Sequence, residues 1–216
     1  MSIIDELSSS VGVKTQEPNS AVAERCLADP DLLREIEAGL ALKNTRLAGD
    51  CAEVMTKVAE RRPDLVAPHA ATLRALLGNK NGRVRWEAAH ALSLVASLVP
   101  ETIAEALDQL RAIVEQDKSV IVRDYIIDAV AGYGASGPEA AGRAFPILSD
   151  ATSAWEEKHA ARALRGLVPL VALAPRLAGE AERLAQEFEG HARAGVQKAA
   201  RALLRAMGDR RGRARP

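Results

Sequence analysis

A proline followed directly by an acidic residue recurs along the chain, and this repeat constrains the fold more than any other feature. The pair occurs as Pro30-Asp31, Pro63-Asp64, Pro100-Glu101 and Pro138-Glu139, and Pro175-Arg176 is a less faithful copy. From Pro63 onward the prolines are 37, 38 and 37 residues apart. A period of this length indicates a chain that stacks copies of one supersecondary unit.

The proline and the acid together mark the start of a helix. Proline lacks an N–H and has its φ angle fixed near the helical value, so it fits the first helical turn, where that N–H would have no partner. An acidic residue in the same turn is favoured by the helix dipole by about 0.3–1 kcal/mol. Each pair therefore predicts that a helix begins there.

Two apolar-periodic segments lie in each period, so each period reads as a helical hairpin. The first, called here the B helix, runs from about Pro100 to Glu115 in the best example, with its apolar face formed by Ile103, Leu107, Leu110 and Val114. A short polar turn follows. The second, the A helix, ends at a glycine-rich stop before Pro138 and presents Val122, Ile126, Ala129 and Val130.

The A-helix segments resemble HEAT repeats. The resemblance rests on GRVRWEAAHALSL, SVIVRDYIIDAVAGY, EEKHAARALRGL and VQKAARALLRA, and on the Val-Arg pairs Val84-Arg85 and Val122-Arg123. It covers about Pro30 to Met207 and implies an all-α, right-handed α-solenoid of about five HEAT-like helical hairpins with terminal capping helices. It also implies a pair between Asp117 and Arg123, whereas the segments around Glu156 and Gln197 lack the arginine.

Length and composition agree with one soluble domain. The chain has 216 residues, of which 48% are apolar, which is enough to bury a sizeable core. We expect an N-terminal cap and linker over 1–18, the solenoid over 19–207, and a disordered arginine-rich tail over 208–216. The N-terminus has neither a basic start nor a long apolar run, so we expect no signal peptide or membrane anchor and a cytoplasmic protein.

No motif in the sequence commits a catalytic group, a metal site or a cofactor. The four histidines fall in different predicted helices and never at the i, i+4 spacing that directs two imidazoles at one metal. Cys26 and Cys51 lack the spacing of a zinc or redox site and read as buried, reduced thiols. The formal charge is zero and only 3% of residues are aromatic, which argues against a dedicated nucleic-acid binder.

The resemblance to HEAT repeats implies a binding surface, because the B helices of that family line its concave face. We expect a protein or peptide partner there, gripped by polar residues at equivalent repeat positions. Trp86 and Trp155 lie near the starts of A helices, where a large ring either seals a junction between repeats or contacts a partner. The candidate partner-binding residues are Arg74, Asp108, Arg111, Arg143, Arg183, Trp86 and Trp155.

An enzyme is the alternative. DNA glycosylases built on HEAT-like repeats use a basic groove, tryptophans and an acidic residue, and Trp86, Trp155, Arg123 and Asp124 are the candidates for those roles. The charge before the tail is unfavourable, with 28 acidic against 25 basic residues, and the two tryptophans are 69 residues apart and so do not occupy equivalent positions. A non-catalytic interaction scaffold is therefore the preferred hypothesis.

Overall fold

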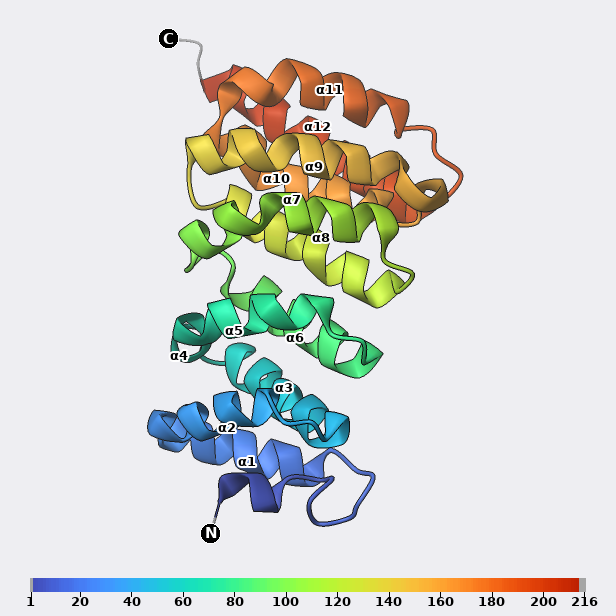
Figure 1. Ribbon diagram of the computed structural model, residues 1–216. Coiled ribbons are helices and arrows are strands. Elements are labelled where there is room, and N and C mark those ends of the chain that lie inside the picture. The colour runs from blue at the N-terminus through green and yellow to red at the C-terminus, as the bar shows by residue number, and fades with distance from the viewer. Residues whose placement is uncertain (1, 214–216) are drawn as a thin grey trace. The chain divides into compact units, whose positions relative to one another are not determined.

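The computed structural model describes residues 2–213, and across that range all regular structure is helical (Figure 1). The all-α prediction is confirmed. The chain forms two compact units, one ending at Thr102 and the other beginning at Ile103. The boundary lies inside helix α7 (Pro100–Gln116), and the proline period did not predict it.

Every repeat proline begins a helical element, as its restricted φ angle predicts. Two of these elements are long α-helices, and the other three are short 3-10 or α-helical turns that lead into a further helix. The elements that begin at these prolines are η2 (Pro30–Leu32), α4 (Pro63–Val66), α7, α9 (Pro138–Glu157) and η5 (Pro175–Leu177).

The N-terminal unit is built around α3 (Thr45–Ala59), which packs on α1, α2 and α6 and is buried along most of its length. Both cysteines lie in this core and are free thiols. The other elements of the unit are η1 (Ile3–Glu6), α1 (Glu17–Ala28), α2 (Leu33–Leu40), η3 (Ala67–His69), α5 (Ala70–Ala75), η4 (Leu76–Gly78) and α6 (Gly82–Val95).

The first residues form the expected cap. Ile3 and Leu7 are buried, and η1 packs against α1 and α2. The linker is shorter than predicted, because α1 already begins at Glu17 with Pro18 in its first turn. Proline is compatible with that position for the same reason as in the repeats, because its missing N–H would have no partner in the first turn.

The C-terminal unit contains two rows of helices (Figure 1). The B row consists of α7, α9 and α11 (Ala178–Glu187), and the A row consists of α8 (Val120–Gly134), α10 (Ala160–Leu173) and α12 (Ala194–Arg213). Helix α10 packs on α8, α9 and α12. The apolar faces predicted for the B helix at Pro100 and for the following A helix are buried, which confirms the helical hairpin.

Helix α12 continues beyond the predicted end of the solenoid. The backbone is helical to Arg213, whereas a disordered tail is predicted from residue 208, and residues 214–216 lie outside the described range. Arginine is a good helix former, and the glycines at 208 and 212 cost only about 1 kcal/mol each relative to alanine. No helix within residues 2–213 is both long and apolar enough to cross a membrane.

Candidate functional site

Two of the predicted partner-binding arginines connect neighbouring B helices. The Nη2 atom of Arg111 in α7 donates to Oδ2 of Asp150 in α9 at 3.0 Å. The Nη2 atom of Arg143 in α9 donates to the backbone carbonyl of Ala104 in α7, also at 3.0 Å. Both side chains therefore brace the B row, and their donors are partly used within the fold.

The other predicted polar residues differ in their surroundings. Asp108 in α7 and Arg183 in α11 are exposed, and neither has an ion-pair partner among the described residues. Arg74 is half-buried in α5 and belongs to the N-terminal unit. The B row thus brings together four of the predicted residues, namely Asp108, Arg111, Arg143 and Arg183, and their role in binding stays a prediction.

The B row of the C-terminal unit is strongly acidic. From Ile103 onward α7 carries three acidic residues and one arginine, α9 carries four and one, and α11 carries three and one. The A row has a net positive charge, with six basic and two acidic residues up to Gly208. The two rows therefore present different potentials to a charged partner.

Trp155 lies in the non-helical turn that closes the C-terminal end of α9 and leads into α10, where it seals a junction. Its indole Nε1 donates to the carbonyl of Val114 at 3.0 Å. The guanidinium of Arg123 stacks on the ring at 3.7 Å from its centroid. Although 37% of the residue is exposed, its ring is already stacked on a cation and its N–H is bonded.

Arg123 belongs to a buried polar chain that links α8 to the start of α10. The residue is 1% exposed, and its Nε donates to Nε2 of His159 at 2.8 Å. Since that nitrogen accepts, the proton of the imidazole is on Nδ1, which donates to Asp124 at 2.7 Å. Burial lowers the pKa of Arg123. Mutual hydrogen bonding thus satisfies the polar groups of the two buried side chains, Arg123 and His159, and of the Asp124 carboxylate.

The backbone of the same turn is in an unusual conformation. Trp155, Glu156 and Glu157 have φ angles of 52°, 56° and 61°, in the left-handed region that non-glycine residues rarely enter. Arg193, just before α12, holds this turn by donating to the carbonyls of Glu156 and Glu157 at 3.3 and 2.6 Å. The hydrogen bonds from Arg193 therefore help to offset the conformational strain at Trp155, Glu156 and Glu157.

The residues of the enzyme alternative only partly converge. Arg123, Asp124 and Trp155 meet at this junction, whereas Trp86 is half-buried on α6 in the N-terminal unit. The three that meet have packing and hydrogen-bonding roles. Among the side chains that the structure describes, residues 2–208, no group of three histidine, cysteine or acidic residues is placed to hold a metal ion.

Comparison with known proteins gives structural likeness and no sequence relative. No model of a known protein family matches the chain, and no curated protein matches it. Among solved structures, a designed armadillo repeat protein in complex with the peptide (KR)4 superposes with a TM-score of 0.72 at 17% identity, over 95% of this chain and 98% of that one.

Two further structures agree. A computationally designed armadillo repeat protein for modular peptide recognition gives a TM-score of 0.68 at 16% identity, over 94% of this chain and 98% of that one. An archaeal HEAT-like repeats protein from Thermococcus onnurineus NA1 gives 0.54 at 12% identity, over 89% and 98%. The fold is an armadillo/HEAT-type α-solenoid.

The armadillo/HEAT-type junctions contain a repeated turn that the sequence pattern did not predict. The side chains of Asn79, Asp117 and His191 each accept from the backbone N–H two residues later, at 2.8–2.9 Å. The carbonyl of each also accepts from the side chain six residues later, which is Arg85, Arg123 or Gln197. The expected partner of Arg123 was the carboxylate of Asp117, and the contact found is to its backbone carbonyl.

Proposed function

We propose that this armadillo/HEAT-type protein is a scaffold that binds a protein or peptide partner along the B row, and that the partner presents a basic, extended segment. The observation that carries the proposal is the excess of carboxylates over arginines on α7, α9 and α11. That the B helices form a concave wall stays a prediction from the HEAT resemblance.

The carboxylates of the B row are available to a ligand. Five of them are exposed and have no ion-pair partner among the described residues: Asp108, Glu115, Glu139, Glu180 and Glu187. Acidic side chains on successive helices of one row reinforce one another's field, which attracts and orients a basic segment. Arg111 and Arg143 contribute by bracing the helices that carry these carboxylates.

The structural likeness supports the same kind of ligand. A designed armadillo repeat protein of similar fold is in complex with the peptide (KR)4, which is basic along its whole length. An extended peptide is a natural ligand for a row of equivalent helices, because side chains repeat along both. At 17% identity the comparison transfers no individual contact residue.

The glycosylase alternative is less well supported. An acidic B row would repel a phosphate backbone, and binding to DNA depends on neutralising phosphates with basic side chains.

The free, buried thiols of Cys26 and Cys51 suit a reducing compartment, which supports a cytoplasmic location for the scaffold.

The test is the charge preference and salt dependence of peptide binding. A fluorescently labelled octapeptide of alternating Lys and Arg is titrated with the full chain, and an octapeptide of alternating Glu and Asp serves as the matched control. We expect binding of the basic peptide alone, weakening as salt is raised because the interaction is electrostatic. Equal binding of both peptides, or failure of the basic peptide to bind at low salt, would refute the proposal.

A further inference from the structure

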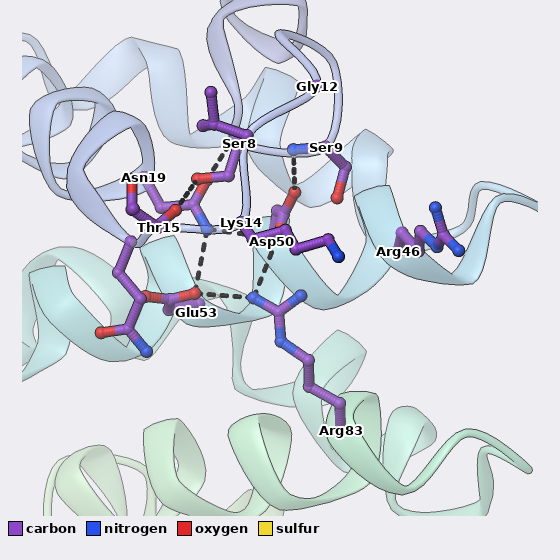
Figure 2. Close-up of a pocket in the computed structure, with 12 residues that line it drawn as sticks. Ser8, Ser9, Gly12, Lys14, Thr15, Asn19, Arg46, Asp50, Glu53 and Arg83 are labelled. Carbon is purple, nitrogen blue, oxygen red and sulfur yellow. Dashed lines mark hydrogen bonds and ion pairs between the residues drawn. The ribbon is translucent and has the colours of Figure 1, made fainter.

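A polar pocket of about 520 Å³ lies in the N-terminal unit, beneath the loop between η1 and α1 (Figure 2). It is lined by residues of α1, α3 and α6 together with the covering loop. Its volume is within the range of small-molecule sites in proteins. The charged residues that line it are Lys14, Arg46, Asp50, Glu53 and Arg83.

The two carboxylates of the pocket are committed to the fold. Asp50 and Glu53 are 1% and 3% exposed. Asn19 donates to both, at 3.2 and 2.9 Å, and the backbone N–H of Ser9 donates to Asp50 at 2.8 Å. Although burial raises the pKa of Asp50, the hydrogen bonds from Ser9, Asn19 and Arg83 outweigh it, and the pKa is lowered.

These carboxylates fix the position of Arg83. Its Nη2 atom lies 2.8 Å from Oδ1 of Asp50 and 2.7 Å from Oε2 of Glu53. Among the described residues, the bonds of this guanidinium involve Nη2 alone, so Nε and Nη1 remain to donate to a ligand. The side chain is 38% exposed, which leaves it accessible from the pocket.

Two further cations stand at the pocket without a partner in the described part of the chain. Lys14 and Arg46 are both exposed and line the pocket. In Figure 2 the Lys14 side chain extends from the covering loop toward the side where Arg46 and the guanidinium of Arg83 lie. Arg46 and Arg83 are each the second residue of a helix, α3 and α6, so the positive ends of two helix dipoles add to their field.

We propose that this pocket binds a small polar molecule through an oxyanion, either a phosphate or a carboxylate, held by Lys14, Arg46 and Arg83. Guanidinium groups bind both oxyanions through paired, charge-assisted hydrogen bonds. A cationic ligand is disfavoured because both carboxylates already form ion pairs with Arg83, and Glu53 also pairs with Lys57. The ligand site is independent of the B row and of the peptide proposed to bind there.

The experiment titrates inorganic phosphate and, separately, acetate into the ¹⁵N-labelled full chain at constant ionic strength, with sodium chloride as the blank. Backbone amide shifts of the covering loop, Arg46 and Arg83 are followed. The test variant is Lys14→Gln with Arg46→Gln, whose exposed side chains can be neutralised without disturbing the core. The matched control is Arg34→Gln with Arg61→Gln, which removes the same charge from exposed positions of this unit outside the pocket lining.

We expect saturable shifts at the pocket with at least one of the two anions, and the anion that binds identifies the oxyanion class. The test variant should weaken this binding at least about tenfold, because two charge-assisted contacts are lost, while the control variant should bind as the natural chain does. The proposal is overturned if neither anion gives saturable shifts, or if the test variant binds as tightly as the control.

Discussion

The guanidinium carbon of Arg123 lies 3.7 Å from the centroid of the Trp155 ring. This stack joins α8 to the turn that leads into α10, two segments more than 30 residues apart in the chain. A cation over an indole is worth up to about 2 kcal/mol when the pair is desolvated, and Arg123 is buried. The junction therefore depends on an aromatic side chain that is itself partly exposed.

Two substitutions of Trp155 should lower the stability of the C-terminal unit by different amounts. Trp155→Phe keeps a ring over Arg123 but removes the N–H that donates to Val114, and should cost about 1 kcal/mol. Trp155→Ala removes the stack as well and should cost about 2–3 kcal/mol. Urea denaturation followed by far-ultraviolet circular dichroism measures both. A smaller loss for alanine than for phenylalanine would contradict the role assigned to the stack.

Glycine at position 156 should stabilise the protein. Glu156 has φ 56° and ψ 39°, a conformation that costs a non-glycine residue roughly 1–2 kcal/mol. Its ion pair with Lys158 is exposed and contributes little. We expect Glu156→Gly to raise the unfolding free energy by about 1 kcal/mol, whereas the control Gln109→Gly, within helix α7, should lower it by roughly 0.5–1 kcal/mol. Destabilisation by both glycines would rule out strain at this turn.

The helical hairpins could be predicted because their signals are local. Each repeat proline begins a helical element, and apolar residues at helical spacing, such as Ile103 and Leu110, are buried. These patterns depend on neighbours within a few turns of the same helix. The same reasoning placed Arg111 and Arg143 on the B row but did not predict their contacts with Asp150 and Ala104, which come from the adjacent repeat.

The junctions and the pocket could not be predicted because their contacts join residues that are far apart in the sequence. His159 bonds Arg123 from 36 residues away, and Asp50 and Glu53 bond Arg83 from the preceding A helix. Lys14 was placed in a plain linker, because nothing in its local sequence shows that the loop folds over α3. Acidic residues inside an A helix were the available signal, since buried carboxylates require partners.

Stability should depend on pH through Glu87. Burial raises the pKa of this carboxyl to about 7 from an ordinary value of 4.5. The folded state therefore holds a proton that the unfolded state has lost between these pH values, so the unfolding free energy falls as pH rises through that window. Glutamine does not titrate, so Glu87→Gln does not lose stability in this window. The unfolding free energy of the variant minus that of the natural chain should therefore increase by roughly 2–3 kcal/mol between pH 5 and pH 8.

Urea denaturation at four pH values from 5 to 8 measures the difference for Glu87→Gln. Glu139→Gln is the control, because Glu139 is exposed and its substitution should give a difference that stays nearly constant with pH. A difference for Glu87→Gln that is equally flat would mean that the carboxyl titrates normally in the folded protein.

Arg111 and Arg183 should differ in their effect on stability. Arg111 bridges α7 and α9 through Asp150, and its Nε is buried. Arg111→Ala should cost about 1 kcal/mol, which is a modest figure because the ion pair is partly exposed. Arg183→Ala, at an exposed position, should change stability by less than about 0.5 kcal/mol. Chemical denaturation of the two variants tests this, and equal effects would remove the bracing role of Arg111.

Whether the acidic B row binds a basic segment is decided by comparing peptide affinity after two different sets of side chains are neutralised. The measurement is the dissociation constant of the labelled Lys-Arg octapeptide for two triple variants whose charge changes are equal in size and opposite in sign. One neutralises the B row through Asp108→Asn, Glu139→Gln and Glu180→Gln, and the other neutralises the A row through Lys198→Gln, Arg201→Gln and Arg205→Gln.

All six side chains are exposed, so both triple variants should fold, which circular dichroism checks. The B-row variant should bind the peptide at least about tenfold more weakly than the natural chain, since it loses three favourable charge interactions. The A-row variant should bind as well as the natural chain or better. Unchanged binding by the B-row variant, with weakened binding by the A-row variant, would show that the peptide does not bind along the B row.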